Sequence, residues 1–487
     1  HKTYTRAYAP EPTLAEHLTF ALKYEGVDLD FLTRVFQHTG AGFVREWVGQ
    51  EPTSAYARRA GFFFEWLTGQ QIDGIQDASG NYVDALDAGR YLVATQADKN
   101  RRWRINDNLP GTAAFCPMIE RSRTLRDTVS LSAEIQALMD DFGEETLLRA
   151  VNWLTVKESR ASFAIESEGK EEDRIHRFAR AMVIHCGQIE EPLSDASLET
   201  LQSGIMGAIT TGFRPGLRRS PVFVGHTADY QPVMDYLAPH FKDVPAMMDG
   251  LRAVAQRTVG QHAVLRAAAL SFGLVYIHPL ADGNGRISRF LINDTLRRDG
   301  VIPTPVILPV SAVISESARH RHEYDQALEV FSKPLMREIG NACSFAQEVQ
   351  YEDGVRSNLQ FDQWQAALPS WRYPDLTLQT QYLSQVIDTA LTEGLRAEAH
   401  YLSRYDKAEQ ALKRQVEGSS EDYARIIRSI TQTRSVSAKL KKIYPLVFDD
   451  VSRSKCIVAE ILRAFEATDG NADDDNFGPI ETVKPIV

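Results

Sequence analysis

The sequence predicts a mainly α-helical fold, in which a helical core with one β-hairpin follows an α+β region and precedes a second helical region. Three observations predict it. Apolar residues recur mostly at helical spacing between about residues 124 and 350. Residues 213–233, FRPGLRRSPVFVGHTADYQPV, interrupt this pattern with glycine, proline and a short β-branched run, which indicate a hairpin. Long helical patterns resume after that region.

Length and composition are those of an ordinary soluble protein with two or more domains. The chain has 487 residues, of which 43% are hydrophobic and 24% are charged, close to globular averages. Its net charge of −11 disfavours binding to nucleic acid or to anionic membranes, so neither partner is expected. No stretch approaches the roughly 20 apolar residues of a membrane span, and the polar start lacks a signal region. We therefore expect a cytoplasmic location. The scattered cysteines indicate reduced thiols.

Residues 1–140 are expected to form the α+β region. The spacing of apolar residues predicts amphipathic helices at 15–26 and 54–69. Short β-prone runs separated by turn residues predict strands at 81–87, 89–95 and 100–107. The helical core is expected over residues 141–349.

Residues 350–487 are expected to form a helical C-terminal domain after an irregular boundary segment. Long helical patterns occupy 380–395 and 397–415. Residues 439–466 have the size of a helix-turn-helix module, but such helix pairs usually serve as packing units, so DNA binding is not expected. Residues 467–487 are acidic and lack periodicity, which indicates an extended tail.

The most informative segment lies between residues 261 and 300. Residues 261–277 are apolar on nearly every face, as in a helix buried at the centre of a domain. Pro279 should end this helix near His278. The loop ADGNG follows, and a new helix is expected to run from near Arg286 to Gly300.

This segment combines residues suited to phosphate chemistry. A glycine-containing loop that leads into a helix forms an anion site, because unpaired N–H groups and the positive end of the helix dipole converge there. Arg286 and Arg289 are spaced i, i+3, so both can reach one anion. Asp282 suits a magnesium ligand among phosphates. The imidazole of His278 suits a base that takes a proton from a hydroxyl near neutral pH.

Taken singly, these features are common, since GNG is an ordinary turn and Asp282 with Arg286 is typical of an ion pair at a helix end. Their combination, HPLADGNGRISR, resembles the signature of the Fic family, His-Pro-Phe-x-Asp/Glu-Gly-Asn-Gly-Arg-x-x-Arg. Leu280 stands where phenylalanine is usual, an apolar replacement that should affect packing rather than chemistry.

The resemblance implies a Fic-type helical core that binds ATP with Mg²⁺ and transfers AMP to a Ser, Thr or Tyr hydroxyl of a target protein, releasing pyrophosphate. It implies that His278 is the general base and that Asp282 holds magnesium. It also implies that Arg286 assists the phosphates and that Arg289 reaches the γ-phosphate. The implied cradle for the α- and β-phosphates consists of Gly283, Asn284 and Gly285.

Family members carry a β-hairpin flap before the signature, to which an extended target segment pairs through its main chain. The hairpin near residues 213–233 occupies the corresponding place, with Val222 and Val224 in its strand-like portion. A solvent-exposed hairpin without a partner is the alternative. Pairing of this kind positions a hydroxyl without specifying the target sequence.

A second motif precedes the core, in the helix expected near residues 157–170. Ser162 and Glu166 are spaced i, i+4 and share one face of this helix. They resemble the family's inhibitory motif, Ser/Thr-x-x-x-Glu-Gly/Asn, with Ser167 in place of Gly or Asn. The resemblance implies that Glu166 pairs with Arg289 and takes the cation meant for ATP. A solvated surface glutamate is the alternative.

The leading interpretation is a magnesium-dependent protein adenylyltransferase inhibited by its own Glu166. Its flanking regions are expected to select the target or to mediate self-association, which leaves a homo-oligomer open. Two alternatives keep the same site: removal of AMP from a protein or use of another nucleotide donor, and a non-catalytic module regulated by nucleotide.

Overall fold

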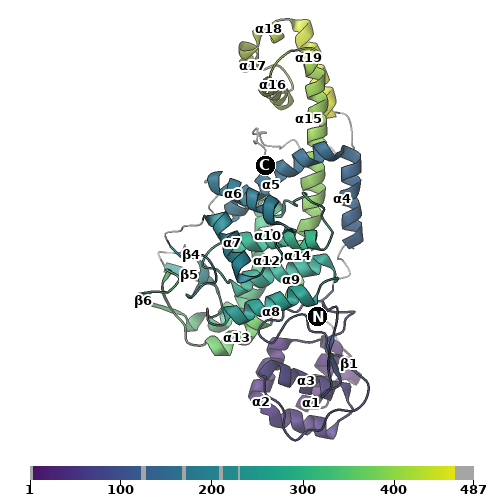
Figure 1. Cartoon of the computed structure of the whole chain (residues 1–487), viewed down its shortest axis with the longest axis vertical. Helices are drawn as coiled ribbons and strands as arrows, with labels where there is room; N and C mark the ends of the chain where they lie inside the picture. Colours follow the sequence, from purple (N-terminus) through teal and green to yellow (C-terminus); the bar gives the residue numbers. More distant parts are fainter. Residues whose placement is uncertain (1–3, 122–127, 167–171, 208–211, 229–230, 467–487) are drawn as a thin grey trace.

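The structure is a computed structural model that describes residues 4–121, 128–166, 172–207, 212–228 and 231–466. The molecule is elongated, with an N-terminal unit, a central helical body and a C-terminal group of helices arranged along its length (Figure 1). Helices dominate the described residues and the sheets are small. The predicted mainly α fold is therefore confirmed. The acidic segment 467–487 lies outside the described residues.

The N-terminal unit packs three helices against a small sheet. The helices are α1 (Leu14–Phe20), α2 (Leu29–Gln50) and α3 (Ala55–Thr68). The strands are β1 (Val83–Asp84), β2 (Asp98–Asn100) and β3 (Ile105–Asp107), with β3 parallel to β1 and antiparallel to β2. The strand predicted at 89–95 was wrong, because only Tyr91 makes a bridge there, to Glu120. Helix α2 was not predicted, and Gly40 interrupts it with a φ of 69°.

The central body is built around α9 (Ala263–Ile277), whose side chains are buried on nearly every face. Its partner is α10 (Asn284–Arg298), and both are surrounded by further helices (Figure 1). These are α4 (Thr128–Phe142), α5 (Glu144–Ile165), α6 (Glu172–His185), α7 (Asp195–Met206), α8 (Val244–Arg257), α11 (Val310–Glu316), α12 (Ala318–Ile339), α13 (Trp364–Arg372) and α14 (Thr377–Thr389).

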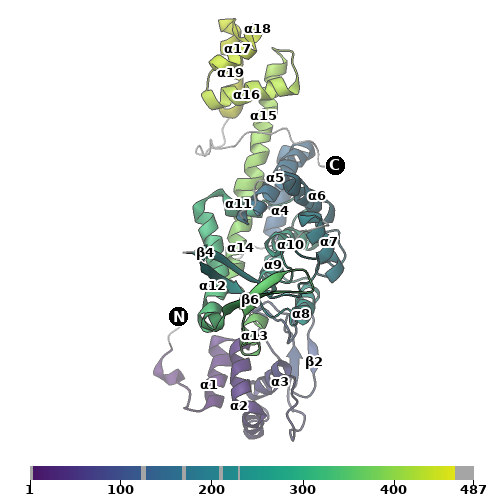
Figure 2. The same cartoon turned by 90° about the vertical axis from the view of Figure 1, so that its left-hand side faces the viewer.

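Two β-hairpins lie on one side of the central body (Figure 2). The first pairs β4 (Phe223–Ala228) with β5 (Gln231–Leu237), so it overlaps the hairpin predicted near residues 213–233 but begins and ends later. The second pairs β6 (Ser344–Gln350) with β7 (Arg356–Gln360), so the helical pattern expected up to residue 350 ends earlier. The rings of Phe223 and Phe345 lie 5.7 Å apart and connect the two hairpins.

The C-terminal helices are joined to the body through α15 (Ala397–Lys413). A π-helical segment, Ala390–Arg396, links α14 to α15. The second half of α15 packs on α16 (Ser420–Thr433) and α19 (Val451–Glu466), while two short helices, α17 (Ala438–Ile443) and α18 (Pro445–Phe448), close the group. The helical C-terminal region therefore contains helices where the sequence predicted them.

Buried apolar residues divide differently from the predicted domain limits. One core runs from Leu92 to Ala399 and includes α13 and α14, so the limit expected at residue 350 falls inside it. It also includes Leu131, Ile135 and Leu138 of α4, so the limit expected at residue 140 falls one helix late. The reason is that α13 and α14 bury apolar side chains against the central body, which periodicity alone does not reveal. Within the described ranges, no helix is long and apolar enough to cross a membrane.

Candidate active site

The signature residues lie in the turn between α9 and α10. The last residue before the turn is His278, which caps α9 in the left-handed region with φ 50° and ψ 58°. This conformation is uncommon for a residue with a side chain. Pro279 follows and cannot continue the helix, so the chain turns away at His278 as expected. The positive φ thus marks the candidate base as the pivot of the turn.

Asn284 closes the loop with its side chain. Its Oδ1 accepts from the backbone N–H of Leu280 at 2.9 Å, and its Nδ2 donates to the Leu280 carbonyl at 2.8 Å. Both groups are buried. The amide of Asn284 therefore shapes the loop, and Leu280 fills the core at the place where phenylalanine is usual in the family.

Helix α10 begins at Asn284, two residues earlier than predicted, with Gly283 as its N-cap. Gly283 has a φ of 91°, which a residue with a side chain rarely adopts. The Asp282 Oδ1 accepts from the Gly283 N–H at 2.5 Å and from Arg286 Nη2 at 2.8 Å. The carboxylate is 39% exposed. Asp282 thus lies at the positive end of the helix and remains accessible.

Arg286 and Arg289, near the start of α10, are each 2% exposed. The guanidinium of Arg286 lies 4.9 Å from the centre of the Phe163 ring, which belongs to α5. Arg289 also faces α5, because its Nε donates to Ser162 Oγ at 2.9 Å and its Nη2 donates to the Ser162 carbonyl at 3.0 Å. Both cations are therefore held between α10 and α5.

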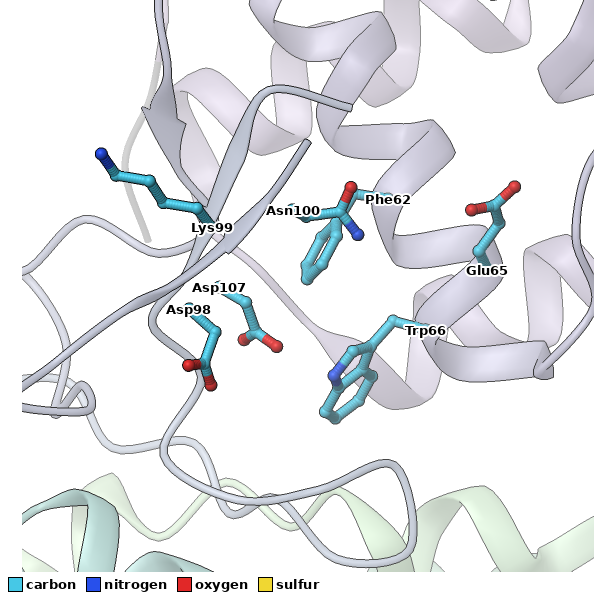
Figure 3. A pocket seen from close by; sticks show the side chains of 7 residues that line it. All are labelled: Phe62, Glu65, Trp66, Asp98, Lys99, Asn100 and Asp107. Carbon is cyan, nitrogen blue, oxygen red and sulfur yellow. The ribbon is translucent and has the colours of Figure 1, made fainter. Parts of the chain in front are cut away.

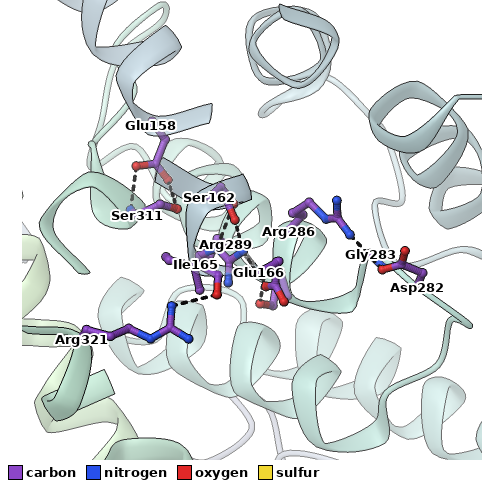
Figure 4. A network of polar contacts seen from close by, with 12 residues as sticks. Glu158, Ser162, Ile165, Glu166, Asp282, Gly283, Arg286, Arg289, Ser311 and Arg321 are labelled. Atoms are coloured by element: carbon purple, nitrogen blue, oxygen red, sulfur yellow. Dashed lines mark hydrogen bonds and ion pairs between the residues drawn. The ribbon is translucent and has the colours of Figure 1, made fainter. Parts of the chain in front are cut away.

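Glu166 completes this contact at the C-terminal end of α5 (Figure 4). Arg289 Nη2 donates to Glu166 Oε1 at 2.9 Å, and the glutamate side chain is 36% exposed. Burial alone would raise the pKa of Glu166, but the charge and hydrogen bond of Arg289 outweigh it and lower that pKa. The glutamate is therefore ionised at neutral pH and forms a salt bridge.

Glu166 also lies directly over the start of α10. A Cβ placed on Gly285 would come within 2.2 Å of Glu166 Oε1, so only glycine permits this approach. Arg289 Nη1 is buried and has no hydrogen-bond partner among the residues that the structure describes. The salt bridge therefore leaves one donor of Arg289 unused beside the loop.

The imidazole of His278 is held in one tautomer. Its Nδ1 lies 3.1 Å from the carbonyl of Val275. A carbonyl only accepts, so Nδ1 carries the proton and Nε2 keeps its lone pair. Burial, followed by the charge of Arg218, lowers the pKa of His278 to about 4. The ring is therefore neutral at physiological pH.

Two positioning residues lie far from the signature in sequence and were not predicted. Arg218 is 2% exposed, and its Nε donates to the His278 carbonyl at 2.7 Å while its backbone N–H donates to the Pro279 carbonyl at 2.9 Å. Gln202 of α7 donates to the Asp282 carbonyl at 2.7 Å and accepts from the Gly216 N–H at 2.8 Å. Both act through main-chain carbonyls, which no local pattern reveals.

The predicted flap residues divide between strand and loop. Val224 lies in β4 and is 44% exposed, whereas Val222 precedes the strand and its carbonyl accepts from the Ala238 N–H at 3.1 Å. Leu217 forms an antiparallel bridge with Leu280, so the segment before the hairpin joins the signature loop. This bridge places the base of the flap beside the candidate site.

Asp282 is the accessible loop carboxylate predicted to hold magnesium. Over the described ranges, no group of three or more His, Cys, Asp or Glu side chains is placed to hold a metal. Mg²⁺ is usually bound by one or two carboxylates together with substrate phosphates and water. A single accessible carboxylate at the start of a helix therefore fits magnesium bound with a phosphorylated substrate, and does not fit a structural metal.

Two cavities lie outside the signature loop. One, of about 350 Å³, lies in the N-terminal unit (Figure 3). It is lined by Phe62, Glu65, Trp66, Asp98, Lys99, Asn100 and Asp107. The other, of about 650 Å³, lies between the N-terminal unit and α12 to α14 and has a lining of apolar and acidic residues. Neither cavity is lined by a residue of the signature loop or by Glu166.

Comparison with known proteins agrees with the geometry of the loop. Residues 192–296 match the model of the Fic/DOC family. The protein adenylyltransferase Fic of Culex quinquefasciatus is 32% identical over 130 residues, which cover 26% of this chain and 22% of that protein. The protein adenylyltransferase fic-1 of Caenorhabditis briggsae is 28% identical over 182 residues, covering 37% of this chain and 31% of that protein. The alignments thus span less than a third of the length of these relatives.

A similar solved structure also has the Fic domain in its title. The crystal structure of a Fic domain containing signaling protein from Bacteroides thetaiotaomicron is 19% identical, with a TM-score of 0.39, and covers 56% of this chain and 97% of that one.

The fold and the loop define a helical protein in which a glycine-containing turn joins two central helices. Its residues 192–296 form a Fic/DOC domain, so the family resemblance seen in the signature is confirmed.

Proposed function

We propose that this chain transfers AMP from ATP to a Ser, Thr or Tyr hydroxyl of a target protein and releases pyrophosphate. The observation that carries this proposal is the convergence of a neutral imidazole, an accessible carboxylate and two buried arginines at the start of α10. Acceleration of in-line attack on phosphorus depends mainly on positioning and on positive charge around the transferred group. The names of the similar proteins support the same reaction.

His278 acts as the base in this proposal. Its Nε2 lone pair takes the hydroxyl proton of the target, and the hydroxyl oxygen attacks the α-phosphorus of ATP. The bond between the α-phosphorus and the bridging oxygen to the β-phosphorus breaks, and pyrophosphate leaves with that oxygen. The Nδ1–H bond to Val275 and the main-chain contacts of Arg218 fix the ring for this transfer.

The start of α10 holds the phosphates. The helix dipole and the backbone N–H groups of Gly283, Asn284 and Gly285 attract the α- and β-phosphates. Arg286 and Arg289 supply positive charge, and the unused Nη1 of Arg289 is a donor for the γ-phosphate. Asp282 would hold Mg²⁺, which when bound neutralises phosphate charge.

Glu166 inhibits this site. Its carboxylate occupies Arg289 and places a negative charge over Gly285, where the phosphates would lie. A phosphate and a carboxylate cannot share this small volume without repulsion. ATP therefore binds poorly or in an unproductive pose until Glu166 moves away. Ser162 supports the inhibited state through its bonds to Arg289.

The direct test replaces Glu166 by glycine and follows transfer of labelled AMP to proteins and to the chain itself. We expect Glu166→Gly to raise the rate at least about tenfold, which corresponds to about 1.4 kcal/mol. The Glu166→Gly/His278→Ala double variant is the control, because it should still bind ATP but lose about 100-fold or more of the transfer rate.

Three results would contradict the proposal. Unchanged transfer after Glu166→Gly would remove the inhibitory role of the glutamate. Transfer at an undiminished rate in the double variant would remove His278 as the base. Labelling from another nucleotide but not from ATP, or loss of AMP from a pre-labelled protein, would replace the reaction with a different one at the same site.

A further inference from the structure

We propose that Glu158 is a positioning residue that holds the inhibitory end of α5 in place and so sets the strength of inhibition by Glu166. This inference rests on the proposed function. It concerns a buried carboxylate two helical turns before Glu166, outside the signature and outside the inhibitory motif (Figure 4).

Glu158 is fixed to the start of α11 by three hydrogen bonds. Its Oε2 accepts from the backbone N–H groups of Ser311 and Ala312 at 2.6 and 3.1 Å, and its Oε1 accepts from Ser311 Oγ at 2.6 Å. The side chain is only 1% exposed. Burying a carboxylate is costly unless donors surround it, and bonds to an ionised acceptor are stronger than neutral ones. This contact therefore holds α5 against α11.

The contact fixes the rotation of α5. Glu158, Ser162 and Glu166 follow each other at steps of four residues, so they lie along one side of the helix. The first is bonded to α11 and the other two are bonded to Arg289 of α10. A rotation or slide of α5 would therefore break both contacts together. Loss of the Glu158 contact frees the helix to carry Glu166 away from Arg289.

A second contact, made by α12, holds the C-terminal end of α5. Arg321 of α12 donates from its Nη1 to the Ile165 carbonyl at 2.9 Å (Figure 4). Helix α12 directly follows α11, and Ser317 caps it. Helices α11 and α12 therefore hold α5 through contacts before and after Ser162 in the sequence. Glu158 supplies the side-chain part of this grip, and Arg321 binds the main chain.

The test compares Glu158→Gln and Ser311→Ala in the full chain, with and without Glu166→Gly. Glutamine loses the negative charge and replaces one acceptor oxygen with an NH2 donor, whereas Ser311→Ala removes only the hydroxyl donor. We expect Glu158→Gln to raise ATP affinity and basal AMP transfer about tenfold, and Ser311→Ala to raise both less. In the Glu166→Gly background, neither change should alter transfer by more than about twofold, because the inhibitory carboxylate is already absent.

Ser159→Ala is the matched control. Ser159 is buried next to Glu158, but its Oγ donates to the Thr155 carbonyl within α5, so it does not link α5 to α11. We expect this variant to keep the basal rate. Thermal unfolding of every variant reports general loss of stability, which would lower transfer in both backgrounds instead of raising it in one.

The outcomes separate this inference from the proposed function. If Glu166→Gly raises transfer but Glu158→Gln and Ser311→Ala leave the basal rate unchanged, Glu158 does not position the inhibitory residue. Loss of transfer by Glu158→Gln in both backgrounds would also overturn the inference, because the role would then be structural. Failure of Glu166→Gly itself to raise transfer would overturn the proposed inhibition and, with it, the role of Glu158.

Discussion

Under the proposed function, Arg289 has two competing partners, Glu166 and the γ-phosphate of ATP. Its Nε and Nη2 are bonded to Ser162 and Glu166, which lie 127 and 123 residues earlier in the chain. A buried guanidinium needs such partners when no anion is bound, because an unpaired buried charge is destabilising. The same group is the cation that a γ-phosphate would bind. Under the proposed function, Glu166 therefore stabilises the site without nucleotide and opposes nucleotide binding.

The state of His278 leads to a prediction about pH. Burial and the charge of Arg218 lower its pKa to about 4, while Glu166 acts in the opposite direction. Removal of Glu166 should lower that pKa further, so the ring stays neutral and competent as a base down to about pH 5. We expect the kcat/KM of Glu166→Gly to show no loss attributable to an imidazole between pH 8 and pH 6.

The measurement is the pH profile of AMP transfer at fixed ionic strength. The Glu166→Gly background is required because burial raises the pKa of Glu158 to about 7, which could change the inhibition in the same range. An acidic limb with a midpoint between pH 6 and 7, the range of an unperturbed imidazole, would contradict the described surroundings of His278.

The residues of the signature could be predicted from the sequence, whereas the residues that hold the loop in place could not. His278, Asp282 and Arg289 belong to one continuous segment, so spacing and resemblance placed them in a single loop. Arg218 contacts this loop 60 residues away through main-chain oxygens. This contact forms only in the folded chain, so the sequence around Arg218 gives no sign of it. Glu158 escaped prediction for the same reason, because its partners lie 153 and 154 residues away.

The β4–β5 hairpin is the element that, by the family resemblance, is expected to present the target. It contains a register shift between Val224 and Gly225, and a Cβ at Gly225 would lie 2.1 Å from the Val233 carbonyl. The strands can pair here only because the side chain is absent. Val224 and Val233 remain exposed on the hairpin. The outer surface of the hairpin is therefore exposed, whereas the pairing of its two strands leaves no room for a side chain at Gly225.

We predict that Gly225→Ala lowers modification of target proteins about tenfold or more while ATP affinity stays within about twofold. The added methyl group must push the two strands apart, which spoils the edge used for main-chain pairing. Gly204→Ala is the control, since a Cβ there has open space and lies in α7. Equal target modification by both variants would argue against a docking role for the hairpin.

Helices with strong periodicity were predicted better than strands, which depend on pairing with another strand. The helices α3, α9 and α10 end close to their expected limits, because caps and prolines act locally. Helix α2 was overlooked because Gly40 and Gly42 break its pattern. The strands β6 and β7 were hidden because pairing across the turn stabilises them more than their own composition does.

The part of the chain that the structure describes contains three apolar cores with unequal connections. The N-terminal core is joined to the central body by main-chain bonds such as Cys116 N–H to the Arg372 carbonyl and Leu376 N–H to the Met118 carbonyl. The C-terminal core begins at Tyr405 of α15, and the central core ends at Ala399 of the same helix. One continuous helix therefore belongs to two cores.

This arrangement predicts more than one unfolding transition. We expect scanning calorimetry of the full chain to show a separate transition for the C-terminal core, because α15 is the main connection described between it and the body. A chain that ends after Arg414 should lose that transition and keep the main one within a few degrees. A single transition, with equal calorimetric and van't Hoff enthalpies, would contradict independent cores.

Domain limits were the least predictable feature of the whole molecule. The sequence placed a boundary at residue 350, where regularity is lost, but the structure continues the central core through Trp371, Leu383 and Leu391. Irregular segments need not separate domains when the helices beyond them return to the same core. Local composition marks where a helix stops, and only packing decides to which body the next helix belongs.

The joining of Glu166 and Arg289 within one chain has a consequence for how the site would respond in solution. A tethered carboxylate has a fixed local concentration, so diluting the protein does not release it. A free nucleotide competes against that fixed value by mass action. The threshold for activity would then follow the nucleotide level alone, and making more or less of the protein would change the output without moving the threshold.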